Sequence, residues 1–106
     1  MITRIWHGYT SRENAQAYEE LLKTEVFIEI KNKQVEGYTG IQLLRRELND
    51  EVEFITIMQF TSLDAVKAFA GEEYEKSYVP AAARRILKRF DEKAQHYDRK
   101  LELTYP

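Results

Sequence analysis

The chain has no cysteine, and only two prolines and four glycines, among its 106 residues. Without cysteine it can form no disulfide and no thiolate metal site, and it has no thiol nucleophile. This composition is compatible with a reducing cytoplasm, where we expect the protein to reside. The scarcity of glycine and proline, with 43% hydrophobic and 32% charged residues, disfavours disordered, collagen-like and low-complexity proteins. We therefore expect a globular protein.

The sequence also lacks a charge excess and a long hydrophobic run. Its 16 Lys and Arg against 18 Asp and Glu give a net charge of −2, without the basic surplus of a general nucleic-acid binder. No apolar run approaches the roughly 20 residues that cross a bilayer, and the N-terminus does not read as a leader. A chain of this length suits one compact domain, residues 1–106, and not two. We expect a soluble cytoplasmic domain with neither a nucleic-acid nor a membrane partner.

Alternation of side chains with period two predicts four strands. They span residues 2–9, 39–48, 51–60 and 93–103. The turn residues Asn49 and Asp50 join the second and third of these strands in a hairpin.

Apolar residues at helical spacing predict the helices. A stripe that starts with Ala15, Tyr18 and Leu22 predicts a helix to about residue 31. Thr10 or Ser11 can cap it, and Glu13 is at capping-box spacing from Thr10. A second helix is expected from residues 61–62, where Thr61 and Asp64 have similar spacing, to Gly71. A further helical stretch is predicted over residues 73–88, interrupted at Pro80.

The predicted order β-α-β-β-α-β is that of the split βαβ, or ferredoxin-like, plan. This is an α+β fold with a four-stranded antiparallel sheet in the order 4-1-3-2 and its helices on one face. Large apolar side chains lie on both sides of the first and third predicted strands, so the second face of the sheet also needs cover. Alternation puts Trp6 on the side opposite His7, and we expect Trp6 on that second face. A second copy of the chain would cover it, which predicts a homodimer.

Four groups of residues together resemble the antibiotic biosynthesis monooxygenase (ABM) domain family. They are Trp6-His7-Gly8, Gly37-Tyr38-Thr39-Gly40 followed by Leu43-Leu44-Arg45-Arg46, the segment from Phe60 to Gly71, and His96-Tyr97. The resemblance covers nearly the whole chain and implies a dimeric α+β barrel. Members of this family include cofactor-independent monooxygenases of polycyclic phenols, haem-degrading enzymes and proteins of no known activity.

The resemblance also implies a cavity between the sheet and the helices. It places His7 about where active members have an Asn that points into this cavity, and Phe69 approximately where haem-degrading members have a Trp. A haem-ligating His would be expected within residues 72–80, but this segment has only Tyr74 and Tyr78. Haem degradation is therefore the weaker interpretation, and haem binding through a residue such as Tyr stays an alternative.

His7 and His96 are the only histidines of the chain. Antiparallel pairing of the first and last strands predicts that they are cross-strand neighbours on one face. A neutral imidazole in such a pair can take a proton from a phenolic or enolic substrate near neutral pH. Histidines of the core or rim that satisfy backbone groups would fit the same pattern. Two histidines without a nearby third ligand predict no metal site.

Aromatic residues of the helical regions could line a pocket for a flat ligand. These residues are Tyr18, Phe69, Tyr74 and Tyr78. Tyrosines serve equally well in a core or at a dimer boundary, so packing is the alternative role.

Together these observations predict an ABM-like, cofactor-independent monooxygenase that acts on a hydrophobic aromatic or phenolic molecule. His7 and His96 would be catalytic and the four aromatic residues would bind the substrate, with no metal or other cofactor. A non-catalytic dimeric module that binds a small ligand is the first alternative, and a haem-binding or haem-degrading relative is the second. A deep aromatic pocket with neither histidine inside it would favour the binding module.

Overall fold

Three long antiparallel strands form the framework of the protein in the computed structural model, which describes residues 1–106. They are β1 (Ile2–Ser11), β2 (Tyr38–Glu47) and β3 (Glu51–Phe60). Two short strands, β4 (Arg89–Phe90) and β5 (Gln95–Asp98), pair with the free edge of β1. The sheet order is therefore β2-β3-β1, followed by β4 and β5 together. This confirms the predicted ferredoxin-like order, with the fourth position shared by two strands.

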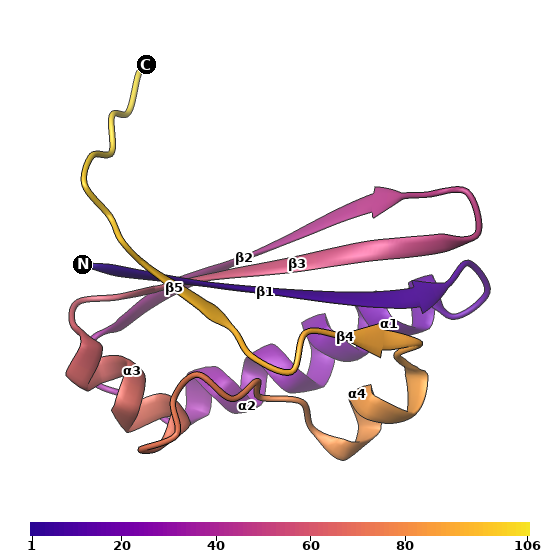
Figure 1. Ribbon diagram of the computed structural model, residues 1–106, viewed down its shortest axis with the longest axis horizontal. Coiled ribbons are helices and arrows are strands. Elements are labelled where there is room, and N and C mark those ends of the chain that lie inside the picture. The colour runs from indigo at the N-terminus through magenta and orange to yellow at the C-terminus, as the bar shows by residue number, and fades with distance from the viewer.

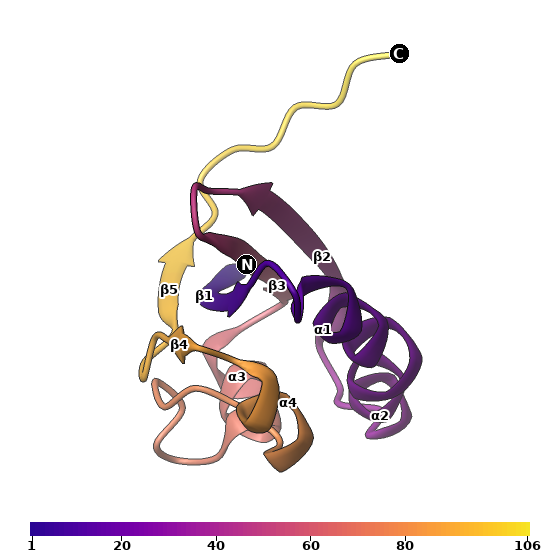
Figure 2. The ribbon, with the colours of Figure 1, turned by 90° about the vertical axis from the view of Figure 1, so that its right-hand side faces the viewer.

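The helices all cover the same face of this sheet (Figures 1 and 2). A continuous rod consists of α1 (Ala15–Leu21), the π-helical turn η1 (Leu22–Val26) and α2 (Phe27–Asn32). Two shorter helices, α3 (Leu63–Ala70) and α4 (Ala81–Ile86), follow the hairpin. No helix has both the length and the apolar character needed to cross a membrane.

The π-helical turn keeps the apolar stripe of the first rod aligned. Tyr18, Leu22, Val26 and Ile30 are each at most 5% exposed, as the spacing predicted. They follow one another at intervals of four residues, which is more than the 3.6 residues of an α-helical turn. The wider turn of a π-helix accommodates the longer interval, so the stripe stays against the sheet.

The core lies between this rod, α3 and the inner face of β3. Phe54 and Phe60 are fully buried, and the Phe54 ring meets the Tyr18 ring edge to face at 4.9 Å. Residues of even number on β3 point to the helices and those of odd number point to the open face. The fold thus has one fully packed sheet face and one without helices.

The starts of both predicted helices are corrected by the structure. Thr10 belongs to β1 and is fully buried there, so it does not cap the first helix, which begins only at Ala15. Ser11, the other candidate, accepts a hydrogen bond from the Asn14 N–H through its Oγ at 3.2 Å just before that helix. Ser62, rather than Thr61, caps α3, because its Oγ accepts a hydrogen bond from the Ala65 N–H at 3.1 Å.

The predicted helix over residues 73–88 is also wrong in its first half, since only α4 is helical. Pro80 disfavours helical geometry in the residue before it. The chain before Pro80 is instead tied to the segment that precedes β5, where Ser77 N–H donates to the Glu92 carbonyl and Ala94 N–H to the Glu75 carbonyl.

The last predicted strand is shortened to β5 because its partner strand ends. Asp98 pairs with Ile2, the first residue of β1, so residues beyond it find no strand to pair with. The C-terminal segment then leaves the body of the molecule on the side of the sheet away from the helices (Figures 1 and 2). Leu101, Leu103 and Tyr105 in this segment are each more than 60% exposed.

Candidate functional site

An apolar cavity of about 40 Å³ lies between the inner face of the sheet and the helices. Twelve of its fifteen wall residues are hydrophobic, and every layer of the fold contributes to it. The wall comprises Arg4, Trp6, Tyr18, Leu22, Val26, Phe27, Ile30, Ile41, Thr56, Met58, Phe69, Tyr78, Val79, Pro80 and Ala83. Neither histidine belongs to it.

Strand β1 presents Arg4 and Trp6 to this cavity. Both side chains are less than 10% exposed, and the Trp6 indole N–H donates to the Asp91 carbonyl at 2.8 Å. The prediction that Trp6 faces the second side of the sheet is therefore wrong. Alternation correctly put Arg4 and Trp6 on the same side of the strand, but it could not tell which side the helices cover.

The Arg4 guanidinium lies at one end of the cavity, between the sheet and residues 74–76. Its Nη1 donates to the Tyr74 carbonyl at 2.6 Å and approaches Nε2 of His96 at 2.9 Å, and its Nη2 donates to the Lys76 carbonyl at 3.1 Å. It also lies 5.6 Å from the centre of the Phe69 ring. Sequence reasoning missed this residue, because an arginine in an alternating strand is most often on the solvent side.

His96 is held beside Arg4 by strand pairing, because Arg4 and His96 are directly opposite each other in β1 and β5. Burial lowers the pKa of His96 from its ordinary value, and the positive charge of Arg4 lowers it further, against a weaker opposing effect of Glu75. The imidazole is therefore neutral at pH 7, and its Nε2 accepts the Arg4 hydrogen bond. The Tyr74 ring meets the imidazole edge to face at 5.2 Å.

His7 lies on the open face of the sheet, away from His96. Its Nδ1 is 3.0 Å from the Asp91 carboxylate, and its neighbours include Leu44, Arg46 and Ile55. The prediction that the two histidines are cross-strand neighbours is wrong, because β5 pairs with the first half of β1 and its register brings His96 to Arg4. The two imidazoles occupy opposite faces of one sheet.

Three of the four predicted aromatic residues do line the cavity. Tyr18 is 1% exposed, and burial raises the pKa of its phenol, so it stays protonated. Phe69 and Tyr78 pack against each other with ring centres 5.4 Å apart and form another wall. Tyr74 lies outside the wall and contacts the cavity only through Arg4 and His96.

Two of the three residues that could ligate a haem iron here, His96 and Tyr18, are not free to do so, whereas Tyr78 also lines the wall. Nε2 of His96, the imidazole nitrogen nearest to the cavity, already accepts the Arg4 hydrogen bond, and the phenol of Tyr18 is held in its protonated form. No three His, Asp or Glu side chains lie close enough together to hold a metal ion.

These features define a small α+β domain of ferredoxin-like fold with an apolar cavity between its sheet and its helices. The fold is that of the ABM domains, as the resemblance in the sequence implied. A Bacillus cereus protein classed as an antibiotic biosynthesis monooxygenase superposes with a TM-score of 0.66 at 16% identity, covering 98% of this chain and 97% of that one. The haem degrader MhuD from Mycobacterium tuberculosis, solved with two haems in its active site, superposes with a TM-score of 0.59 at 18% identity, covering 98% and 100%. No protein-family model and no curated protein matches the sequence.

Proposed function

We propose that this protein binds a small, largely hydrophobic and aromatic molecule in the cavity between the sheet and the helices. The observation that supports this function is the wall itself, which is hydrophobic at twelve of fifteen positions and contains no histidine. Ligand sites are typically concave, apolar and furnished with few polar groups. An apolar cavity with no histidine in its wall favours the binding module over the monooxygenase.

The cavity must widen before it takes a ring. About 40 Å³ accommodates only a few water molecules. One part of the wall, residues 78–80, belongs to a segment without helix or strand, whereas the opposite parts belong to the rod and the sheet. Segments of this kind open at lower free energy than packed helices and strands. We therefore propose that residues 78–80 give way to the ligand.

Filling the cavity is expected to abolish ligand binding. Ala83 is 1% exposed and lines the cavity, so Ala83→Leu places three more carbons in the space that the ligand needs. Trp6 is the only tryptophan and also lines the cavity, so its fluorescence reports occupancy. Titration with 2-indanone, a small neutral aromatic ketone, is expected to change this fluorescence saturably in the unmodified protein and not in Ala83→Leu.

The neighbouring residue supplies the matched control for this experiment. Ala82 is exposed on α4, so Ala82→Leu adds the same atoms to the same helix outside the cavity and should leave the titration unchanged. Thermal unfolding of both variants checks that they are folded. An unaltered response to 2-indanone in folded Ala83→Leu would contradict binding in this cavity.

The second candidate function is oxygenation of the bound ligand without a protein-held cofactor. The observation that favours this candidate is the neutral imidazole of His96, which lies beside the Arg4 guanidinium in the wall of the cavity. In this role an acidic C–H or O–H of the ligand takes the place of Arg4 at Nε2 of His96 and transfers its proton there. Arg4 then holds the resulting anion. The anion reduces O₂, so that an activated CH₂ becomes a carbonyl and the second oxygen atom leaves as water.

The two histidines allow the oxygenase candidate to be tested on the proton-transfer step alone. Exchange of the acidic protons of 2-indanone in D₂O, followed by proton NMR, is expected to slow by about 10²-fold or more in His96→Ala. His7→Ala should leave the rate unchanged, because His7 is on the opposite face of the sheet. Equal rates in both variants would refute this candidate and leave ligand binding untouched.

We also propose that a second copy of the chain covers the open face of the sheet. The centre of this face is apolar, with the facing pair Ile5 and Ile57 beside Ile55, and with Leu44 46% exposed. The charged residues at one end are already paired within the chain, as in the ion pair between Arg46 and Glu53 at 2.7 Å. Two such faces can meet about a twofold axis without leaving an unpaired charge between them. The C-terminal segment leaves the body on this same side (Figure 1) and would lie against the second copy.

A further inference from the structure

Arg4 is the only charged side chain in the wall of the cavity, and no carboxylate neutralises it. The residue is 3% exposed, and it takes part in none of the eight ion pairs of the chain. Burial lowers its pKa to about 10, which still leaves the guanidinium charged at pH 7. A buried charge without a counter-charge is costly in a folded protein, so its presence at this point needs an explanation.

The hydrogen bonds of Arg4 leave part of the guanidinium free. Its five N–H groups meet only three acceptors, the carbonyls of Tyr74 and Lys76 and Nε2 of His96, and all three are uncharged. The Nε–H and one N–H of Nη2 remain without an acceptor in the chain. Every completely buried polar side-chain atom has a hydrogen-bond partner. The free Nε–H is therefore within reach of a solvent-sized molecule, although the residue as a whole is buried.

Charges of both signs surround this end of the cavity, since Glu72 and Glu73 line the surface beside Phe69 and Tyr78. Lys33, which follows α2, places its ammonium 4.3 Å from the centre of the Tyr78 ring and 5.2 Å from that of Phe69. Lys67 on α3 lies 5.8 Å from the Tyr74 ring. The acidic group that acts on His96 is Glu75, and its effect is weaker than that of Arg4. These outer charges oppose one another, so the charge that would hold an anion inside the cavity is that of Arg4 itself.

We propose that the ligand of the cavity is an organic carboxylate, whose charged end pairs with Arg4 and whose aromatic or aliphatic body lies against the apolar walls. This inference rests on the proposed binding function and adds the charge of the ligand to it. A carboxylate has two oxygens for the two free N–H groups, and guanidinium pairs with it in a planar, charge-assisted arrangement. It also supplies the counter-charge that the chain lacks.

A matched pair of ligands tests the proposal. The probes are 3-phenylpropionate and its uncharged amide, 3-phenylpropionamide, which have nearly the same shape. Titration at neutral pH with Trp6 fluorescence as the signal is expected to give an affinity about tenfold or more higher for the acid. In Arg4→Met the two affinities should agree within about twofold, with that of the amide unchanged.

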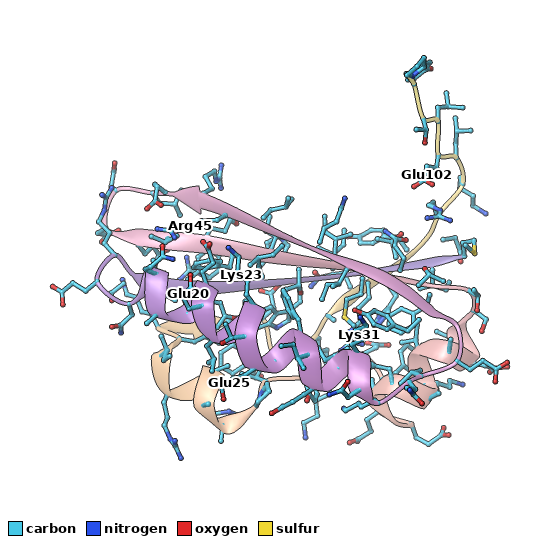
Figure 3. The ribbon with its side chains drawn as sticks, turned by 180° about the vertical axis from the view of Figure 1, so that it is seen from behind. Glu20, Lys23, Glu25, Lys31, Arg45 and Glu102 are labelled. Carbon is cyan, nitrogen blue, oxygen red and sulfur yellow. The ribbon has the colours of Figure 1, made fainter.

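The control variant removes one positive charge elsewhere. Lys31 on α2 is exposed and does not line the cavity (it is labelled in Figure 3), so Lys31→Met should keep the preference for the acid. A second measurement covers the case that Arg4→Met does not fold. In the unmodified protein, the Nε–H NMR signal of Arg4 should shift on addition of the acid and not on addition of the amide.

The outcomes separate this inference from the proposed function. Equal affinities for acid and amide in the unmodified protein, or an unchanged preference in folded Arg4→Met, would overturn the assignment of a carboxylate and leave the cavity as a neutral site. Binding of 2-indanone but of neither phenylpropionyl probe would overturn it as well. If none of the three compounds binds, the proposed function fails together with the inference.

Discussion

Replacing Phe54 with alanine is expected to lower the free energy of unfolding by about 3–5 kcal/mol. Phe54 is fully buried at the centre of β3, and its ring packs edge to face on Tyr18 and lies 5.7 Å beneath the Arg45 guanidinium. Its removal leaves a void between the sheet and α1 that the rigid rod cannot close. Urea unfolding followed by circular dichroism measures the change.

The adjacent residue is the control, because alternation puts it on the other face. Ile55 is half-buried on the open face of the sheet. In a monomeric chain, Ile55→Ala should therefore lower the free energy of unfolding by less than about half as much as Phe54→Ala. If the second copy covers this face, the cost of Ile55→Ala should rise with protein concentration. Equal costs for both variants at every concentration would contradict the assignment of the two faces.

Replacing Ile57 with lysine is expected to convert a dimer into single chains. Ile57 lies opposite Ile5 at the apolar centre of the open face, and twofold symmetry brings two new ammonium groups into one interface. An unpaired buried charge costs about 3–5 kcal/mol, so the dissociation constant should rise by roughly 10²–10³-fold or more. Sedimentation equilibrium over a range of concentrations measures this constant.

A lysine on the helix side controls for the change in net charge. Ala17 is exposed on α1, and Ala17→Lys should leave the dissociation constant unchanged. Sedimentation of the unmodified protein as single chains at micromolar concentration would contradict the dimer. Undiminished association of Ile57→Lys would show that the open face is not the interface.

Ion pairs between surface charges connect the rod to β2, but they contribute little to the stability of the protein. Glu19 pairs with both Lys23 at 2.7 Å and Arg45 at 3.0 Å, so these ion pairs link the first helix to the edge strand. Figure 3 labels Lys23 and Arg45 on these two elements. Exposed ion pairs of this kind contribute little to stability. The predictions of largest effect concern buried side chains such as Phe54 instead.

The sequence was sufficient for the elements whose pattern is long and self-consistent. The stripe from Tyr18 to Ile30 predicted the first helix even though Val26 to Ile30 also alternates, because burial of the stripe needs helical spacing. The hairpin of β2 and β3 was predicted within one residue at each end, since strong alternation flanks a polar turn. The fold class rested largely on these elements.

The candidate site was predicted only in part, because its geometry depends on register. Tyr18, Phe69 and Tyr78 could be named from helical faces and the resemblance, and all three line the cavity. The pairing of His96 with Arg4 could not be predicted in this way. The end of β1 that pairs with β5 depends on the irregular segment between α4 and β5, which has no periodic pattern.

By itself, the sequence determined the ferredoxin-like order of elements, the division of each long strand into two faces and the absence of thiol chemistry. Only the tertiary structure decided which face of β1 the helices cover, and so that Arg4 and Trp6 are inside while His7 is outside. The physical reason is that alternation is symmetric: a strand with large side chains on both sides can bury either one. The choice is made by the packing of β3, α1 and α3 against it, which no local pattern contains.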